Sequence, residues 1–406
     1  MILPKPRGVV TIGVTSRRTI GVSVSVVAFA SLFFGGFCFV RPSQAFVANP
    51  NGNIVSASSR GRTTTATTTD RTTRVRLLMG GGAGGGGATT TFLDTVSNAA
   101  SKTLGRNVRL EPTTGGGAAG GGGATTGAVL DKETNTRYFI KSARNGYAML
   151  RGEYEGVKAM SETLASSTST LRVPTPIAFG EHESTGQAFA LFEYLEFCGG
   201  GSNGQYELGV ALAKMHQSGT SPNRDTTPFG FHVDNTIGAT FQPNLPWHRD
   251  WADFWDQHRL GHMLKLTGNA GGLSPDKVAA LRKKTRELLS PESRGGDPVL
   301  ASIVHGDLWG GNKGFCKDNN TDGIAPAIFD PASYYGDREV DVAMTYVFGG
   351  FSGDFYDGYN SVWPLSEGHE KRRTVYNLYH ILNHDVLFGG SYIRQAQGMI
   401  DQILRY

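Results

Sequence analysis

One segment, residues 303–348, restricts what this chain can fold into more than any other. Asp307 and Asn312 are five positions apart in the stretch HGDLWGGN, and Asp330 closes the apolar run AIF that follows. A tight turn containing glycine lets the first two side chains converge on one pocket. Phosphoryl transfer from a nucleotide needs one carboxylate as a base, and an amide and a further carboxylate as metal ligands. The spacing therefore predicts Asp307 as the catalytic base and Asn312 and Asp330 as ligands of Mg²⁺.

A second pair of residues is suited to the phosphates of a nucleotide. Residues 138–141 (YFIK) are predicted to form a strand ending at Lys141, and residues 147–164 repeat apolar side chains with the period of a helix. Glu153 lies near the start of that helix, where its carboxylate could pair with the Lys141 amine. A solvated lysine at a strand end is the commoner case in isolation. The position of Lys141 before this predicted helix favours the functional alternative, in which Lys141 contacts the phosphates and Glu153 holds its ammonium in place.

Two glycine-rich stretches, residues 80–91 and 115–126, are near-copies of each other: GGGAGGGGATTT and GGGAAGGGGATT. The first is predicted to be a flexible linker. The second lies between two strand-like segments, residues 107–110 and 127–130. A hairpin tip at that place would cover the nucleotide phosphates with backbone N–H groups. No G-x-G-x-x-G phasing selects particular glycines, so the loop is assigned as a whole.

The stretch HGDLWGGN followed by AIFDPASYYGDREVDVAM resembles, nearly letter for letter, the fructosamine kinase (ketosamine-3-kinase) family. This family belongs to the protein-kinase-like group that includes the aminoglycoside phosphotransferases. MLRGEYEGVKAM and FGFHVDNTIGAT are similar to it as well, and the resemblance covers about residues 105–405. It implies an α+β, two-lobed protein-kinase-like fold. The small β-rich N-lobe would span residues 92–195, and the larger helical C-lobe with the catalytic loop residues 196–406.

The resemblance also implies roles for residues that pattern alone leaves open. The linker between the lobes, whose backbone would hydrogen-bond an adenine edge, is implied at Glu193, Tyr194 and Leu195. Trp309 would stack on the apolar face of a sugar. His384, in preference to His380, would also face that sugar. The structural alternatives are a plain core strand for the linker and a packed core residue for the histidine.

The reaction implied by the resemblance is ATP-dependent phosphorylation of the 3-hydroxyl of a ketosamine, which is a sugar attached to an amine by glycation. ATP and Mg²⁺ would be the cofactors and glycated amines or proteins the substrates, so the biological role would be deglycation. Two alternatives stay open. A kinase for an aminoglycoside or amino alcohol would share the base and metal ligands but would not need Trp309. A non-catalytic binding module is disfavoured, because all five kinase positions are filled.

Several polar residues near these motifs are expected to be structural. Asp341 is expected to brace the catalytic loop by accepting backbone N–H bonds, and His216 to be packed or capping rather than catalytic. Asn235, Thr236 and Gln242 could meet a sugar. We expect them instead to hydrogen-bond their own loop.

Charge is unevenly distributed along the chain. Of the 39 Lys and Arg side chains, ten lie in residues 1–90, which carry only one of the 35 acids, Asp70. The remaining residues therefore carry 29 basic and 34 acidic side chains. A nucleic-acid-binding protein would need a basic face on this part of the chain. The mildly acidic balance argues against such a partner.

The first 91 residues have the composition of a targeting leader. Arg17 and Arg18 precede 22 mostly apolar residues, and the small residues around Ala45 suit cleavage by a signal peptidase. This pattern predicts a signal peptide over residues 1–45. Residues 46–91 are basic and rich in Ser and Thr, and the last part of this segment is rich in Gly. This order resembles the two-part presequence of algae with secondary plastids. We expect a plastid protein with no stable membrane association after leader removal. The alternatives are an uncleaved anchor and the secretory pathway.

Overall fold

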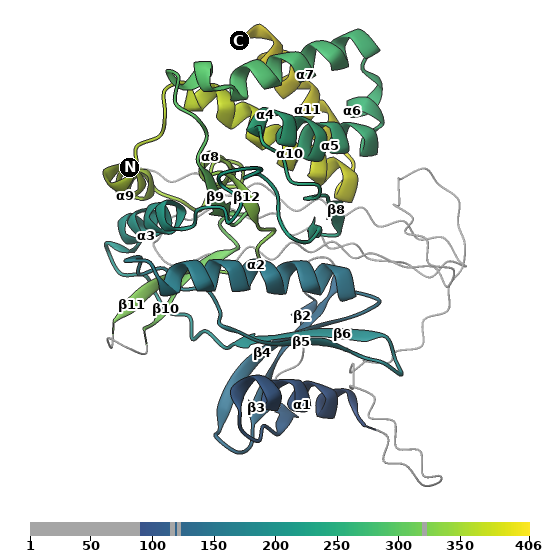
Figure 1. Cartoon of the computed structure of the whole chain (residues 1–406), viewed down its shortest axis with the longest axis vertical. Helices are drawn as coiled ribbons and strands as arrows, with labels where there is room; N and C mark the ends of the chain where they lie inside the picture. The colour runs from purple at the N-terminus through teal and green to yellow at the C-terminus, as the bar shows by residue number, and fades with distance from the viewer. Residues whose placement is uncertain (1–89, 114–117, 120–122, 319–322) are drawn as a thin grey trace, which may run out of the picture. The chain divides into compact units, whose positions relative to one another are not determined.

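The computed structural model describes residues 90–113, 118–119, 123–318 and 323–406. The predicted signal peptide and nearly all of the leader lie outside these residues, as does much of the second glycine-rich stretch. The described chain forms a small β-rich lobe and then a larger, mainly helical lobe (Figure 1), which confirms the predicted α+β, two-lobed fold. Within the described ranges, no helix is long and apolar enough to cross a membrane.

The small lobe is built on one antiparallel sheet with the strand order β1-β3-β4-β6-β5, and β2 pairs with β3. The strands are β1 (Leu110–Pro112), β2 (Ala118–Ala119), β3 (Thr125–Asp131), β4 (Thr136–Arg144), β5 (Pro176–His182) and β6 (Gln187–Glu193). The pairing of β1 with β3 confirms the predicted hairpin. Its first strand begins at Leu110 rather than Asn107, because the N–H of Arg109 donates to the Asp131 carboxylate instead of to a strand.

Alternating side chains on the strands serve two different helices. On β6, Phe189 and Leu191 pack with α1 (Phe92–Leu104), whereas Ala190 and Phe192 pack with α2 (Tyr147–Ala165). Figure 1 shows α1 and α2 on opposite faces of the sheet. The same alternation on β4 directs Lys141 towards α2. The two-residue period of the strand thus selects which helix can supply the partner of this lysine.

The large lobe has one extended apolar core, which includes Trp255, Phe355 and Tyr379. Its helices are α3 (Gly204–Ser218), α4 (Trp251–Phe254), α5 (Gly261–Leu266), α6 (Gly268–Gly272), α7 (Pro275–Leu289), α8 (Glu339–Met344), α9 (Gly353–Val362), α10 (His369–Phe388) and α11 (Tyr392–Arg405). Its strands are β7 (Asn235–Ile237), β8 (Thr240–Gln242), β9 (Ala301–Val304), β10 (Lys313–Lys317), β11 (Ile324–Ile328) and β12 (Tyr334–Asp337).

Two small antiparallel pairs position the predicted catalytic segment. Strand β9 pairs with β12, and β10 pairs with β11. The loop of residues 305–312 connects β9 to β10, and the loop of residues 329–333 connects β11 to β12. Both loops therefore run between the same two strand pairs, which places them next to each other.

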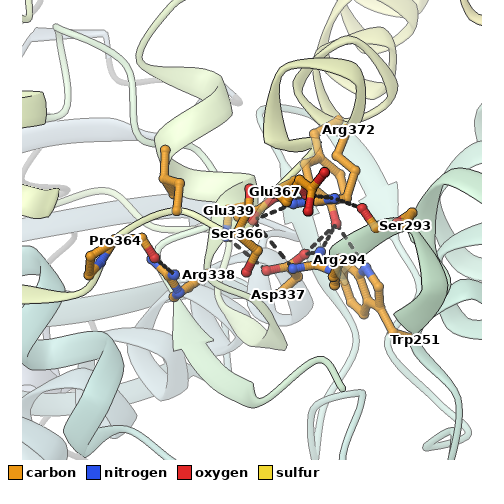
Figure 2. A network of polar contacts seen from close by, with 12 residues as sticks. Trp251, Ser293, Arg294, Asp337, Arg338, Glu339, Pro364, Ser366, Glu367 and Arg372 are labelled. Carbon is orange, nitrogen blue, oxygen red and sulfur yellow. Dashed lines mark hydrogen bonds and ion pairs between the residues drawn. The ribbon is translucent and has the colours of Figure 1, made fainter. Parts of the chain in front are cut away.

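A buried ionic network holds the helical lobe together behind these strands. Figure 2 shows Arg294 and Arg372 converging on Asp337 and Glu339. Arg372 contacts both carboxylate oxygens of Glu339, at 2.7 and 2.9 Å, and Tyr376 donates to Asp337. All these groups are at most 5% exposed. Each charge therefore depends on its ionic partner for stabilisation, because water cannot take the place of that partner.

The buried ionic network leads to a prediction about the stability of the protein. Replacing Arg372 with methionine should lower the free energy of unfolding by about 3–5 kcal/mol, because Glu339 would be left buried with an incomplete partner. The matched control is Lys371→Met, one residue earlier and exposed, which should change stability by no more than about 0.5 kcal/mol. Urea titration of the two variants measures both values. Equal losses would contradict the interpretation.

Candidate active site

The two loops are joined by their backbones. The N–H of Phe329 donates to the carbonyl of Asn312 at 3.1 Å, and the N–H of Ala332 donates to that of His305 at 2.8 Å. The side-chain amide of Asn312 donates to the Asp307 carbonyl at 2.9 Å and lies 3.4 Å from both the Asp307 carboxylate and the Asp330 carbonyl. The structure therefore brings together the three residues that spacing alone placed in one pocket.

The first turn of the catalytic loop requires glycine. Gly306 has φ +80°, and a Cβ atom there would lie 2.2 Å from the carbonyl oxygen of Ala332. Asp341 on α8 accepts the N–H groups of His305 and Gly306 at 2.7 and 2.8 Å. This confirms the predicted bracing role of Asp341. The turn that carries Asp307 is consequently held by a buried carboxylate and by the neighbouring loop.

The environment of Asp307 favours its protonated form. Burial raises the pKa of Asp307 to about 7, and the negative charges of Asp330 and Asp341 act in the same direction. A carboxyl group with a pKa near neutrality can take up a proton during a reaction and release it afterwards. This property suits the predicted base.

Lys141 links the two lobes. Its ammonium lies 2.7 Å from Glu153 on α2 and 2.6 Å from Asp330, and its side chain is 8% exposed. Burial lowers the pKa of Lys141, but the two carboxylates outweigh burial, and the net effect is an increase. Burial raises the pKa of Glu153 to about 7, against the opposing charge of Lys141. The predicted pairing of Lys141 with Glu153 is therefore present, and the metal-ligand candidate Asp330 shares the same ammonium.

The close approach of α2 to the large lobe depends on a second glycine. A Cβ atom on Gly152 would lie 2.4 Å from the Cβ of Asn235 and 2.8 Å from its Cα. No other residue could occupy this position without moving α2 away from β7. Glu153 is the next residue along the helix. The glycine therefore sets the distance from which Glu153 reaches Lys141.

Two cavities meet at Glu153 and Asp330, which line both. The larger, of about 410 Å³, opens beside the predicted base, and the second, of about 350 Å³, lies under the sheet. The larger is also lined by Met149, Thr236, Gly238, Asp307, Trp309, Asn312, Phe348, Asn383, His384 and Phe388. The second is also lined by Thr126, Phe139, Lys141, Phe192, Glu193, Tyr194, Leu195, Phe197 and Phe329.

The second cavity has the features of a nucleobase site. Its walls are mostly apolar, and the rings of Phe197 and Phe329 lie 5.1 Å apart on one side. The N–H of Glu193 already donates to the Thr175 carbonyl at 2.8 Å. The N–H of Leu195 has no hydrogen-bond partner in the part of the chain that the structure describes. Within the predicted linker, Leu195 is therefore better placed than Glu193 to donate to an adenine edge.

The larger cavity has an aromatic wall. Trp309 is 39% exposed there and lies edge-on to Phe348, whose ring is 4.7 Å from that of His384. Nδ1 of His384 donates to the carbonyl of His380 at 2.8 Å, and the ring lines the cavity. His380 is buried, and both its ring nitrogens lack a partner among the described residues. The structure thus brings Trp309 and His384 to one cavity and leaves their contact with a sugar as a prediction.

The other polar residues singled out by sequence act mainly as supports. Asn235 donates to the Ser333 carbonyl at 2.8 Å, and Gln242 donates to Asn235 and to the Ala332 carbonyl. Both residues thus bond within their loop, as expected, and also to the loop that carries Asp330. His216 is buried and packed, which confirms its expected structural role. Thr236 differs, because it lines the larger cavity.

Sequence reasoning missed four aromatic residues of the site: Phe197, Phe329, Phe348 and Phe388. Phe329 carried a signal, because it directly precedes Asp330. Phe348 ends the segment of residues 303–348 but carries no local signal of its own, and neither do Phe197 and Phe388. Only the folded chain shows that they reach the cavities.

The donor set fits Mg²⁺. Asn312 and Asp330 offer amide and carboxylate oxygens, and Mg²⁺ commonly binds one or two carboxylates and completes its shell with water and substrate phosphates. No cluster of three or more His, Cys, Asp or Glu side chains suited to a metal occurs among the described residues. With Asn312 and Asp330 as protein ligands, Mg²⁺ would complete its shell with water and with the phosphates of a nucleotide.

Comparison with known proteins gives a consistent result. The model of a family described as fructosamine kinase matches residues 94–406. A probable ketoamine kinase from Synechocystis is 44% identical over 66% of this chain and 83% of its own length. A chloroplastic protein-ribulosamine 3-kinase from Arabidopsis thaliana is 41% identical over 66% of this chain and 76% of its own. The crystal structure of a candidate fructosamine-3-kinase from Thermobifida fusca superposes with a TM-score of 0.59 at 26% identity, over 77% of this chain and 99% of that one.

The raised pKa of Asp307 predicts a pH-dependent gain in stability when the carboxylate is removed. Since its folded-state pKa exceeds the unfolded value, stability falls as pH rises from about 4 to about 7. In metal-free buffer at pH 8, Asp307→Asn should be more stable than the wild type by up to about 4 kcal/mol, and the gain should shrink steadily towards pH 4. Thermal melts across this range measure it. The control is Asp225→Asn, whose side chain is 88% exposed and which should show no pH-dependent gain. If Asp307→Asn also shows no pH-dependent gain, the buried environment assigned to Asp307 is refuted.

Proposed function

The chain belongs to the fructosamine kinase family, and on this basis we propose that it phosphorylates the 3-hydroxyl of ketosamines with ATP. The relatives at 44% and 41% identity are named as a ketoamine kinase and a ribulosamine 3-kinase. The observation that carries the proposal is the meeting of the two cavities at Asp330, next to Asp307. One cavity suits a nucleobase, and the other suits a sugar beside a base.

The side chains divide the work of the transfer. Asp307 accepts the proton of the attacking 3-hydroxyl as the new oxygen–phosphorus bond forms and ADP leaves. Lys141 binds the nucleotide phosphates, and Glu153 holds its ammonium in place. Tyr194 and Leu195 supply backbone groups to the adenine edge, while Trp309 and His384 orient the sugar. Positioning and electrostatic stabilisation provide most of the rate, because little covalent chemistry falls to the protein.

Asn312 and Asp330 would hold Mg²⁺. When bound, this cation neutralises negative charge on the transferring phosphoryl group. It would also relieve the mutual repulsion of Asp307 and Asp330, which contributes to the raised pKa of Asp307. The donor chemistry and the charge of the site support the assignment.

The product explains a role in repair. A phosphate on the 3-position is a better leaving group than hydroxide, so the phosphorylated adduct can eliminate phosphate and release the free amine. Glycated amines or glycated proteins are therefore the proposed substrates. A kinase acting on an aminoglycoside or amino alcohol is the second candidate, and it would not need the wall formed by Trp309.

An ATP-consumption assay with a glycated lysine tests the function. The wild type should turn over this substrate, and Asp307→Asn should lose about 10²- to 10⁴-fold in kcat, the usual contribution of a general base. Asp225→Asn is the control and should keep wild-type activity. Equal turnover by wild type and Asp307→Asn would refute the base. Turnover of an aminoglycoside or amino alcohol but not of the ketosamine would favour the second candidate.

We also propose that the protein is imported into a plastid. The composition of residues 1–91 supports this location, and the Arabidopsis relative is named as chloroplastic. A fluorescent protein fused to residues 1–91 should enter the plastid of an alga with secondary plastids, whereas a fusion to residues 1–45 should enter the secretory pathway only. Secretion of both fusions would show that the leader is a plain secretory signal.

A further inference from the structure

Behind the catalytic loop, a chain of buried hydrogen bonds continues beyond Asp341. Besides the two backbone N–H groups, Asp341 contacts Nε2 of His216 at 3.1 Å. Nδ1 of His216 lies 2.9 Å from the hydroxyl of Tyr359 on α9, and Nη1 of Arg338 lies 3.1 Å from that same hydroxyl. His216, Tyr359 and Asp341 are at most 1% exposed, so water cannot substitute for any of these contacts.

One assignment of donors and acceptors gives every group in this chain a hydrogen-bond partner. A guanidinium can only donate, so the oxygen of Tyr359 accepts from Arg338 and its proton is free to be donated to Nδ1 of His216. Burial raises the pKa of Tyr359, so its hydroxyl stays protonated. With Nδ1 accepting, Nε2 carries the ring proton and donates it to Asp341. The hydroxyl of Tyr359 therefore selects the histidine tautomer that Asp341 requires.

Arg338, the first donor of this chain, is itself rigidly held. Its guanidinium lies 4.0 Å from the ring centre of Trp363 and donates to the carbonyls of Trp363 and Pro364, at 3.0 and 2.5 Å. Figure 2 shows Arg338 beside Pro364 and next to the network of Asp337 and Glu339. The connection between α9 and α10 thus anchors one end of the chain, and the backbone of the catalytic loop forms the other end.

We propose that Tyr359 is a positioning residue for the catalytic loop, acting through His216 and Asp341 on the backbone of His305 and Gly306. This inference rests on the proposed function, because the loop carries the base Asp307. Without the hydroxyl, Nδ1 of His216 loses its donor, and the ring is no longer held from that side in the orientation that presents Nε2–H to Asp341. The position of Asp341 is then less fixed, and so is the acceptor of the two backbone N–H groups. A displacement of about 1 Å at a reacting group can lower a rate about 10²-fold.

The test compares Tyr359→Phe with Tyr356→Phe. Tyr356 lies one turn earlier on α9, and its hydroxyl bonds to Thr345 at 3.0 Å. Among the described residues, this hydroxyl makes no hydrogen bond to His216. Both variants lose one phenolic oxygen from the same helix. Tyr359→Phe should lower kcat at least about 10-fold and leave the KM for ATP within about twofold, whereas Tyr356→Phe should keep the wild-type kcat.

Amide hydrogen exchange gives a readout that does not depend on turnover. In Tyr359→Phe, a peptide containing His305 and Gly306 should exchange faster than in the wild type, while peptides from β4 and β6 should not change. Faster exchange throughout the protein would indicate general destabilisation and would overturn the proposal, as would wild-type exchange at the loop. A wild type without ketosamine kinase activity would refute the proposed function, and the exchange result would still decide this inference.

A second pair of variants serves if Tyr359→Phe does not fold. Glutamine in place of His216 keeps an acceptor for Tyr359 and a donor for Asp341, whereas leucine keeps neither. His216→Gln should therefore retain loop protection and a higher kcat than His216→Leu. Equal protection and equal kcat in these two variants would overturn the proposal.

Discussion

The site depends above all on the ammonium of Lys141 lying between the carboxylates of Glu153 and Asp330. One positive charge faces two partners at 2.7 and 2.6 Å, and a third acid, Asp307, lies close enough to Asp330 to have its pKa raised by it. Buried charges of one sign are tolerated only when they are compensated. The described side chains alone leave this cluster short of positive charge, and a metal–nucleotide complex between Asn312 and Asp330 would supply a divalent cation there.

The same cluster joins the two lobes. Lys141 comes from the sheet, Glu153 from α2, and Asp330 from a loop of the large lobe. Gly152 lets α2 approach β7 closely, while the loop of Asp330 is tied by backbone bonds to the loop of Asp307. Asp330 itself has φ 62°, an unusual conformation for a residue other than glycine and one that is found at functional sites. The fold thus accepts local backbone strain and buried charge where the proposed chemistry occurs.

The sequence allowed the main elements of this site to be predicted because each has a local signal. The strand that carries Lys141, the helical period around Glu153, and the spacing of Asp307, Asn312 and Asp330 all lie within short segments. The predicted end of that strand at Lys141 is wrong, because the pairing of β4 with β6 continues to Arg144. The relay from Arg338 to Asp341 could not be predicted, because His216 and Tyr359 lie 143 positions apart and nothing local pairs them. The aromatic wall at Phe348 and the contact of Gly152 with Asn235 depend in the same way on how distant segments pack.

The central claim is that Asn312 and Asp330 bind one metal ion together with the phosphates of the nucleotide. The most direct measurement is the anomalous scattering of Mn²⁺, used in place of Mg²⁺, in crystals grown with a non-hydrolysable ATP analogue. The account predicts a single strong peak in contact with the oxygens of both side chains and of the phosphates, with Lys141 on the phosphates. A metal bound elsewhere, or a nucleotide outside the cavity lined by Leu195 and Phe329, would contradict it.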